Sequence, residues 1–300
     1  MRLGLHIPTT SWQGGPQRLG PVLAEVVEAA EAAGFDTITV ADHVWLHPIM
    51  GGPERGHPEA YTMLGFIAAH TRRARLLALA TAASYRPAGL LAKIVTTLDV
   101  LSGGRAMLGI GAGDYVEEAT GLGLPFPPLR ERFELVEETV QACLAMWAGE
   151  QGSEEPFRGA HVQMDRPLNL PQSLSRPHPP ILIAGSGDRR TLPLVARYAD
   201  ACNIAPSPEL PRKLDLLRSL CEQEGRSFDA IEKTAPFVFD VGKDGAKVPE
   251  LLDRLRWFSS LGIESVLGWV EGVDQIEPLE TIGRDVIPVI AEWPARVGDV

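Results

Sequence analysis

Residues 81–118, TAASYRPAGLLAKIVTTLDVLSGGRAMLGIGAGDYVEE, decide the fold class that we expect for this chain. They predict the end of one strand over 81–83, a helix over 88–101 and an apolar strand over 105–112. Glycines border the second strand on both sides, and Asp114 follows it. A buried parallel strand whose carboxyl end opens through glycines is where an α/β protein places its ligand. The stretch therefore predicts an α/β fold and the position of its site.

The same alternation of strand and helix extends along the chain in both directions. Short apolar runs predict strands, and runs with apolar residues at helical spacing predict the helices between them. We expect strands over residues 3–8, 35–41, 75–83, 105–112, 180–184, 201–205, 235–241 and 263–269. Strands that alternate with helices imply parallel pairing with right-handed crossovers. These strand–helix units in a chain of 300 residues predict a closed TIM (β/α)8 barrel.

An open doubly wound sheet is the alternative architecture. Its dinucleotide-binding form needs the pattern G-x-G-x-x-G after the first strand. Gly109, Gly111 and Gly113 instead give G-x-G-x-G, and they belong to the fourth predicted strand. Residues 149–179 interrupt the alternation because they are polar and rich in Gly and Pro. We expect them to form a surface insertion with a short hairpin near 160–164.

The composition disfavours several classes of partner. A net charge of −11 argues against nucleic acid or an anionic membrane surface as a general partner. The three cysteines form no C-x-x-C pair, so we expect buried thiols in a reducing compartment. No signal-peptide pattern opens the sequence, and no apolar run reaches the roughly 18 residues of a membrane span. We expect a soluble cytoplasmic protein whose partner is a small molecule.

Asp42 and His43 follow the second predicted strand and are the leading acid/base candidates. The active site of a TIM barrel lies at the carboxyl ends of its strands. Histidine titrates near neutral pH, and a neighbouring carboxylate can hold it in one tautomer or raise its pKa. We therefore expect Asp42 to act on His43. The alternative is that Asp42 caps the loop and His43 is a packing residue.

Other strand ends offer further polar side chains. His6 alternates with apolar neighbours in the first strand, so we expect it to face the barrel mouth, the alternative being a core histidine. Asp114 and Glu117 follow the glycine exit of the fourth strand and are candidates for the pocket. Glu118 is expected on the surface. Asn203 ends the sixth strand.

Gly185, Ser186 and Gly187 form a small-residue turn before a predicted helix. Backbone N–H groups and the helix dipole at such a turn favour a phosphate, and Arg189 or Arg190 would add charge. The alternative is an ordinary turn with solvated arginines. The remaining histidines have no metal-ligand spacing, so we expect no metal site.

The combined motifs resemble one family, the luciferase-like monooxygenase superfamily. The similarity covers nearly the whole chain, and its segments are ADHV (41–44), YRPA (85–88), LAK (91–93), LDVLSGGR (98–105), GIGAG (109–113), GLPFPP (123–128) and PPILIAGSG (179–187). The branch that this chain resembles most uses the deazaflavin coenzyme F420. Users of flavin mononucleotide (FMN) share most of these motifs.

The resemblance implies a single TIM-barrel domain over residues 1–300 with a flat tricyclic cofactor in the barrel mouth. Family members often carry a non-prolyl cis peptide bond beneath the ring, and the matching link here would be Ala82–Ala83. By position, the implied catalytic residues are His43, Asp42 and Asp114. The implied cofactor contacts are His6, Thr81, Ala82, Ala83, Gly113, Glu117, Gly185, Ser186, Gly187 and Asn203.

Three functions stay open from the sequence. The first is hydride transfer between coenzyme F420 and a small organic substrate, with His43 as the acid/base residue. The second is an FMN-dependent monooxygenase that uses reduced flavin and oxygen. The third is a non-catalytic barrel that binds flavin or deazaflavin. Specificity is expected from residues 9–18, 44–59 and 149–179, and the family resemblance implies a homodimer.

Overall fold

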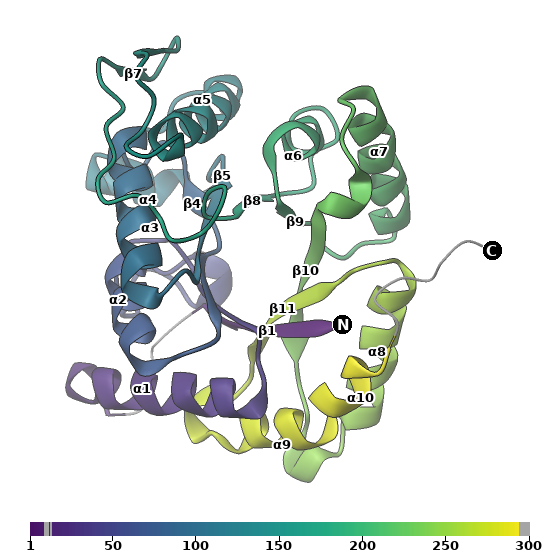
Figure 1. Ribbon diagram of the computed structural model, residues 1–300. Helices are drawn as coiled ribbons and strands as arrows, with labels where there is room; N and C mark the ends of the chain where they lie inside the picture. The colour runs from purple at the N-terminus through teal and green to yellow at the C-terminus, as the bar shows by residue number, and fades with distance from the viewer. Residues whose placement is uncertain (9–11, 13, 294–300) are drawn as a thin grey trace.

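The computed structural model describes residues 1–8, 12 and 14–293, and its strands close into a parallel barrel surrounded by helices (Figure 1). This confirms the predicted TIM-barrel architecture. The barrel strands are β1 (Arg2–Ile7), β2 (Thr37–Val40), β3 (Arg75–Ala78), β4 (Thr81–Ala82), β5 (Ala106–Gly111), β8 (Ile181–Ala184), β9 (Ala201–Asn203), β10 (Glu232–Phe239) and β11 (Ser265–Val270). β3 and β4 share one position in the ring.

The strand order closes the ring. β1 pairs in parallel with β2 on one side and with β11 on the other. From β11 the order continues through β10, β9 and β8 to β5. β5 then pairs with β3, where Leu76 lies opposite Ala106 and Leu77 lies opposite Met107. Because the described barrel strands all run in parallel, their carboxyl ends meet at a single mouth.

The helices pack around the outside of the barrel (Figure 1). They are α1 (Pro16–Ala33), α2 (Ala60–His70), α3 (Ala88–Ser102), α4 (Val116–Leu122), α5 (Leu129–Trp147), α6 (Thr191–Tyr198), α7 (Leu210–Gln223), α8 (Val248–Ser260), α9 (Glu277–Asp285) and α10 (Ile287–Ala291). α1 begins at a proline, which suits a first helical turn, and ends before Gly34, which adopts a left-handed conformation.

Both faces of the barrel strands are buried. Inside the barrel, a cluster of apolar side chains comes from five different strands: Leu77, Met107, Leu182, Ala201 and Leu267. The opposite faces pack against the helices. Burial on both faces explains why these strands read as continuous apolar runs rather than as an alternation of apolar and polar residues.

The strand predicted over 75–83 is interrupted. β3 ends at Ala78, and the chain resumes pairing with β5 as β4 at Thr81. The non-prolyl cis peptide bond joins Leu79 and Ala80, between the two strands. The prediction of a cis bond at Ala82–Ala83 is therefore wrong. The bond lies three links earlier in the chain, in the break between β3 and β4, and it follows Leu79 rather than an alanine.

Residues 149–179 lie outside the strand–helix alternation, as predicted. A short antiparallel hairpin joins β6 (Phe157–Arg158) to β7 (Gln163–Met164), so it begins slightly earlier than expected. The later part of the segment is attached to α3. The backbone N–H of Leu174 donates to Asp99 at 2.7 Å, and Lys93 donates to the carbonyl of Leu170.

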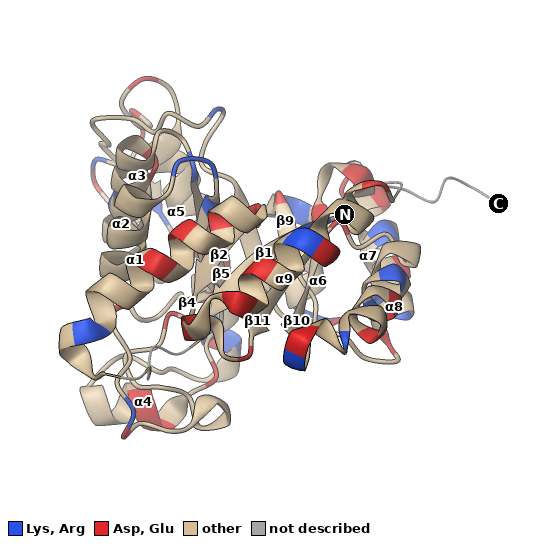
Figure 2. Cartoon of the chain, turned by 90° about the horizontal axis from the view of Figure 1, so that it is seen from below, with Lys and Arg blue, Asp and Glu red and all other residues tan. Residues whose placement is uncertain are grey.

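The surface of the barrel carries mixed charge. Acidic and basic residues both occur along outer helices such as α1, α8 and α9 (Figure 2). Among the helices that the structure describes, none is long and apolar enough to cross a membrane.

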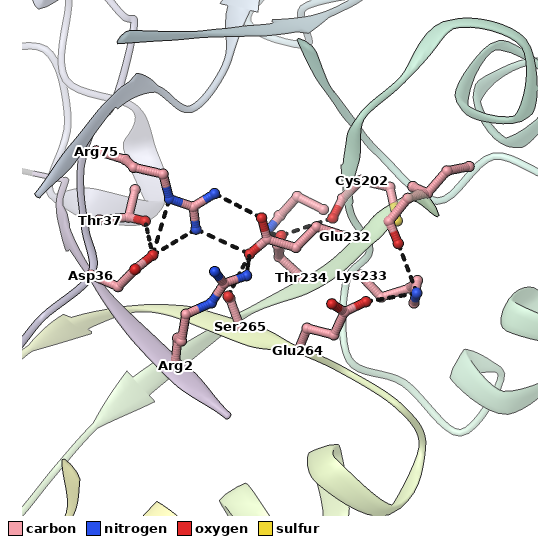
Figure 3. A network of polar contacts seen from close by, with 12 residues as sticks. Arg2, Asp36, Thr37, Arg75, Cys202, Glu232, Lys233, Thr234, Glu264 and Ser265 are labelled. Atoms are coloured by element: carbon pink, nitrogen blue, oxygen red, sulfur yellow. Dashed lines mark hydrogen bonds and ion pairs between the residues drawn. The ribbon is translucent and has the colours of Figure 1, made fainter. Parts of the chain in front are cut away.

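A network of charged side chains closes the end of the barrel opposite the mouth (Figure 3). Arg75, at the start of β3, reaches across to Glu232, at the start of β10, with an Nη1–Oε2 distance of 2.8 Å. Arg75 also pairs with Asp36 at 2.6 Å, and Arg2 pairs with Glu232 at 2.8 Å. The hydroxyl of Ser265 donates to the same carboxylate. The network therefore links the first residues of four barrel strands.

This network makes the stability of the barrel depend on pH. Burial alone would raise the pKa of Glu232, but Arg75, Ser265 and Arg2 outweigh it and lower the pKa to about 2. The stabilisation is therefore complete above the ordinary glutamate pKa and is lost as pH falls toward about 2. We expect Glu232→Gln to lower the free energy of unfolding at neutral pH by about 3 kcal/mol. Urea unfolding followed by circular dichroism measures this.

Glu224→Gln is the matched control, because Glu224 pairs with Arg197 on the surface. Exposed pairs of this kind contribute at most about 1 kcal/mol. We also expect the unfolding free energy of Glu232→Gln to fall less than that of the wild type as the medium is acidified. Parallel pH profiles for the wild type and Glu232→Gln would contradict this assignment.

Candidate active site

A cavity of about 400 Å³ opens at the barrel mouth, and we call it the mouth cavity. It is lined by residues at the carboxyl ends of β2, β3, β4, β5 and β8 and by residues of α5 and α6. These are Asp42, His43, Leu79, Ala80, Ala82, Tyr85, Gly111, Ala112, Gly113, Asp114, Leu129, Phe133, Ala184, Gly185 and Thr191. This volume suits a small-molecule site. No Lys or Arg is among these described lining residues. Its ionisable groups are Asp42, His43, Tyr85 and Asp114.

Glu118 is a fully buried carboxylate beside this cavity. Its oxygens accept hydrogen bonds from the His43 ring at 3.0 Å and from the Tyr85 hydroxyl at 2.5 Å. They also accept from the backbone N–H groups of Trp45, at 2.8 Å, and of Val44. A buried charge is stable only when it is paired in this way. Glu118 thereby holds the loops after β2 and β4 against α4.

The prediction that Glu118 lies on the surface is wrong. It lies in the first turn of α4, where Tyr115, Glu118 and Ala119 are all buried while Glu117 is exposed. Residues at positions i, i+3 and i+4 share one face of a helix, whereas adjacent residues do not. Recognition of α4 in the sequence would have placed Glu118 on the buried face.

Glu118 sets the protonation of His43. Burial alone would raise the pKa of Glu118, but the hydrogen bonds from His43, Tyr85 and Trp45 outweigh it and the pKa is lowered. An ionised carboxylate only accepts hydrogen bonds, so Nδ1 of His43 carries a proton and donates it to Glu118. Burial alone would lower the pKa of His43. The negative charges of Glu118, Asp114 and Asp42 raise it by more, so the pKa of His43 lies above its ordinary value. Nε2 is then the nitrogen that gains or loses a proton.

Asp42 does not act as the hydrogen-bond partner that we expected for His43. Both of its oxygens accept from the guanidinium of Arg86, at 2.6 and 3.0 Å. Arg86 also donates to Glu59 at 2.6 Å. Asp42 is almost fully buried, and this bidentate pair fixes the loop after β4 to the end of β2. The carboxylate that holds His43 is Glu118, which is distant in sequence.

The floor of the mouth cavity is made of very small residues. A Cβ on Gly113, which has a φ of 72°, would lie 2.9 Å from the Cβ of Ala82. A Cβ on Gly111 would make ordinary van der Waals contact, 3.7 Å from the nearest atom, the carbonyl oxygen of Ala184. Small side chains on adjacent strand ends leave a shallow surface on which a flat ring system fits. The residues present therefore suit a tricyclic cofactor.

The turn at 185–187 is tightly held beside α6. Ser186 Oγ accepts from the backbone N–H of Ala205 at 3.0 Å, and Lys213 donates to the Ser186 carbonyl at 2.6 Å. A Cβ on Gly187 would lie 3.0 Å from the hydroxyl of Thr191. The turn therefore brings its backbone close to the first turn of α6, and the phosphate site expected there stays a prediction. Of this turn, Gly185 lines the mouth cavity.

The structure brings six of the predicted site residues into the mouth cavity: Asp42, His43, Ala82, Gly113, Asp114 and Gly185. The others lie around it. Thr81 shares a hydrogen bond of 2.7 Å with Tyr61, and Asn203 donates to Thr234 at 2.8 Å. Their assignment as cofactor contacts stays a prediction, as do those of Ala83, Glu117, Ser186 and Gly187.

His6 lies inside the barrel, where Nδ1 is 2.7 Å from the hydroxyl of Thr39. Burial, together with His57 and His43, lowers the pKa of His6 to about 4, so its ring is neutral near pH 7. Its expected contact with the cofactor stays a prediction. Of the segment 9–18, from which we expected specificity, residues 9–11 and 13 lie outside the described residues.

Three residues that support the mouth, Tyr85, Arg86 and Arg132, were not predicted as site residues. Tyr85 and Arg86 were noted only as part of a motif, yet they bind the two buried carboxylates of the mouth. Arg132, from α5, donates to the carbonyls of Ala112 at 3.3 Å and Gly113 at 2.5 Å. It thus supports the glycine turn after β5 from behind.

Comparison with known proteins agrees with this fold. The family model described as luciferase-like monooxygenase matches residues 1–276. The chain therefore belongs to the luciferase-like monooxygenase family, and the resemblance seen in the sequence is confirmed.

Several relatives share one name. A protein of Nakamurella multipartita named F420-dependent glucose-6-phosphate dehydrogenase is 32% identical over 74% of this chain and 64% of its own length. A protein of the same name from Beutenbergia cavernae is 35% identical over 66% of this chain and 56% of its own length. The matched part of this chain thus spans less than two thirds of either relative.

Among solved structures, an F420-dependent secondary alcohol dehydrogenase in complex with an F420-acetone adduct has a similar fold. It covers 96% of this chain and 98% of its own, with a TM-score of 0.79 and 16% identity. A similarity at this level of identity supports the barrel fold.

The role of Glu118 can be tested on the titration of His43. We expect Glu118→Gln to lower the pKa of His43, because the neutral amide removes the charge that offsets burial. The amide oxygen still accepts from the Val44 and Trp45 backbone. The chemical shift of the His43 Cε1 proton, followed by NMR against pH, measures the effect.

Glu117→Gln is the control, because it removes the same charge one residue away on the exposed face of α4. It should leave the His43 titration close to that of the wild type. An equal fall of the His43 pKa in both variants would show that Glu118 acts only through its long-range negative charge and not through its hydrogen bond to His43. Thermal unfolding of both proteins checks that they remain folded.

Proposed function

We propose that this protein is a coenzyme F420-dependent oxidoreductase that transfers a hydride between the deazaflavin and a small organic substrate. The observation that carries the proposal is the pairing of His43 with the ionised, buried Glu118 at the edge of a cavity floored by small residues. The names of the relatives support the choice of coenzyme. FMN is the alternative cofactor.

Different residues of the mouth would bind the ring and the phosphate of the coenzyme. Ala82, Gly111 and Gly113 would carry the ring. The turn at 185–187, at the start of the segment leading into α6, would hold the phosphate through backbone N–H groups. When bound, the deazaflavin supplies the hydride chemistry.

His43 would act as the general acid or base of the reaction. Its Nδ1 is occupied by Glu118, so Nε2 would take the proton of a substrate hydroxyl in the oxidation direction or return one in the reduction direction. Glu118 stabilises the charged ring that results. Because Glu118 and the loops it binds are already in place, His43 needs no rearrangement to act.

The lining of the mouth cavity bears on the substrate. Glucose 6-phosphate, which appears in the names of the relatives, carries a doubly charged phosphate near neutral pH. The described lining residues offer no Lys or Arg to such a group. We therefore propose a small organic substrate without restricting it to sugar phosphates.

Paired titrations test the choice of coenzyme. The purified apo-protein is titrated with coenzyme F420 and with FMN, followed by tryptophan fluorescence. We expect clearly tighter binding of coenzyme F420, and then turnover in a panel of alcohols, ketones and glucose 6-phosphate. A preference for FMN with oxygen consumption would favour the monooxygenase. Tight binding without turnover across the panel would favour a non-catalytic barrel.

Gly111→Leu tests the placement of the ring. Gly111 lines the mouth cavity and has no left-handed φ, and a Cβ there would meet no atom closer than 3.7 Å, so the added side chain would take up space in the cavity. We expect the affinity for coenzyme F420 to fall at least about tenfold. Gly65→Leu, on the exposed face of α2, is the control and should bind as the wild type does. Unchanged binding by Gly111→Leu in a folded protein would place the ring elsewhere.

We further propose that the protein is a cytoplasmic homodimer. Several large apolar side chains on and beside α3 are exposed: Leu90 (53%), Leu101 (74%), Leu170 (54%) and Leu174 (55%). Contact with a second copy would remove this apolar surface from water. Sedimentation velocity measures the oligomeric state, and a monomer at all concentrations would contradict the proposal.

A further inference from the structure

A group of four arginines surrounds a second, smaller cavity just outside the mouth. This cavity, of about 270 Å³, lies between the first half of α5 and the start of α6, and we call it the arginine cavity. Arginines are not otherwise expected to gather in a chain whose net charge is −11. The residues that line it are Arg130, Phe133, Glu134, Glu137, Arg189, Arg190, Pro193, Leu194 and Arg197.

Two of the four arginines already have acidic partners. Arg130 pairs with Glu134 at 2.7 Å, and Arg197 pairs with Glu137 at 3.1 Å and with Glu224 at 2.9 Å. Arg189 and Arg190 are exposed and form no ion pair with any residue that the structure describes. The cavity therefore holds two positive charges that the protein leaves uncompensated.

The remaining acidic residue of the neighbouring turn is neutralised from the other side. Asp188 pairs with Arg212 at 2.8 Å and with Lys213 at 2.7 Å. These bonds hold its carboxylate against α7. Asp188 thus does not cancel the charge of Arg189 and Arg190, which follow it directly in sequence.

The arginine cavity adjoins the mouth cavity. Phe133 lines both cavities, and the guanidinium of Arg190 lies over its ring at 5.6 Å from the centroid. Gly185 and Thr191 line the mouth cavity, whereas Arg189 and Arg190, which lie between them in sequence, line the arginine cavity. A ligand that leaves the mouth past the turn at 185–187 would therefore meet these two arginines first.

We propose that the arginine cavity binds the anionic tail of the coenzyme, a flexible chain of carboxylates that extends beyond the phosphate of coenzyme F420. The inference rests on the proposed function. Guanidinium groups suit this ligand because they bind carboxylates through two parallel hydrogen bonds. FMN has a phosphate but no such chain, so the cavity would also discriminate between the two cofactors.

The contribution of the arginine cavity should be modest and sensitive to salt. Exposed ion pairs each contribute little, and dissolved ions screen them. Two free arginines acting on several carboxylates would tighten binding by roughly fivefold to tenfold at low ionic strength. This gain in affinity should shrink at high ionic strength and should grow with the number of glutamate units, each carrying a carboxylate, in the tail of the coenzyme.

The experiment compares three ligands: deazaflavin with several glutamates, deazaflavin that ends at the phosphate-linked group, and FMN. Each is titrated into the wild type and into the double variant Arg189→Gln/Arg190→Gln, at low and high salt. Arg218→Gln is the control, because Arg218 is an exposed arginine on α7 that lies 4.1 Å from the ring centroid of Phe228, away from the mouth. It removes the same type of charge from a similar stacked position.

We expect the double variant to bind the long-tailed form roughly fivefold to tenfold more weakly at low salt, with little change for the other two ligands. Arg218→Gln should bind all three as the wild type does. Equal affinity of the wild type for long and short tails would overturn the tail site while leaving the proposed function intact. Failure of the wild type to bind any deazaflavin would instead overturn the proposed function.

Discussion

The ionised carboxylate of Glu118, fully buried beside the barrel mouth, is the constraint on which the site depends. Such a charge is stable only if donors surround it, and His43, Tyr85 and the backbone of Val44 and Trp45 provide them. Meeting this need fixes two loops and orients the imidazole. The same interaction that folds the mouth therefore also prepares His43 to exchange a proton at Nε2.

Two further groups of buried charges hold other parts of the barrel together. They are the pair of Asp42 with Arg86 and the network around Glu232. Asp42 and Arg86 join the loops at the mouth, whereas Arg75 and Glu232 join strands at the opposite end. Both ends are thus held by charged groups while the apolar layers fill the middle. In a TIM barrel the first end carries function and the second carries stability, and the partners of these carboxylates follow that division.

Much of the fold was readable in the sequence, because parallel strands buried on both faces leave long apolar runs and each one is followed by a helical period. The strand ends then located the mouth, including His43 and Asp114. The identity of the carboxylate beside His43 was not readable. That identity depends on how the short helix α4 is rotated, since Glu118 lies on its buried face and Glu117 on its exposed face. It also depends on a contact between two residues that are 75 positions apart in sequence. The cis bond was also misplaced, because its position depends on the break between β3 and β4, which the continuous apolar run over 75–83 does not reveal.

We propose that the mouth holds a deazaflavin ring beside His43 and the phosphate of the coenzyme at the turn of Gly185, Ser186 and Gly187. A crystal structure of the protein with coenzyme F420 bound tests it most directly. We expect a ring lying over Ala82 and Gly111 with its reactive edge within reach of Nε2 of His43. A ring bound outside this cavity, or a phosphate that does not contact the turn, would contradict it.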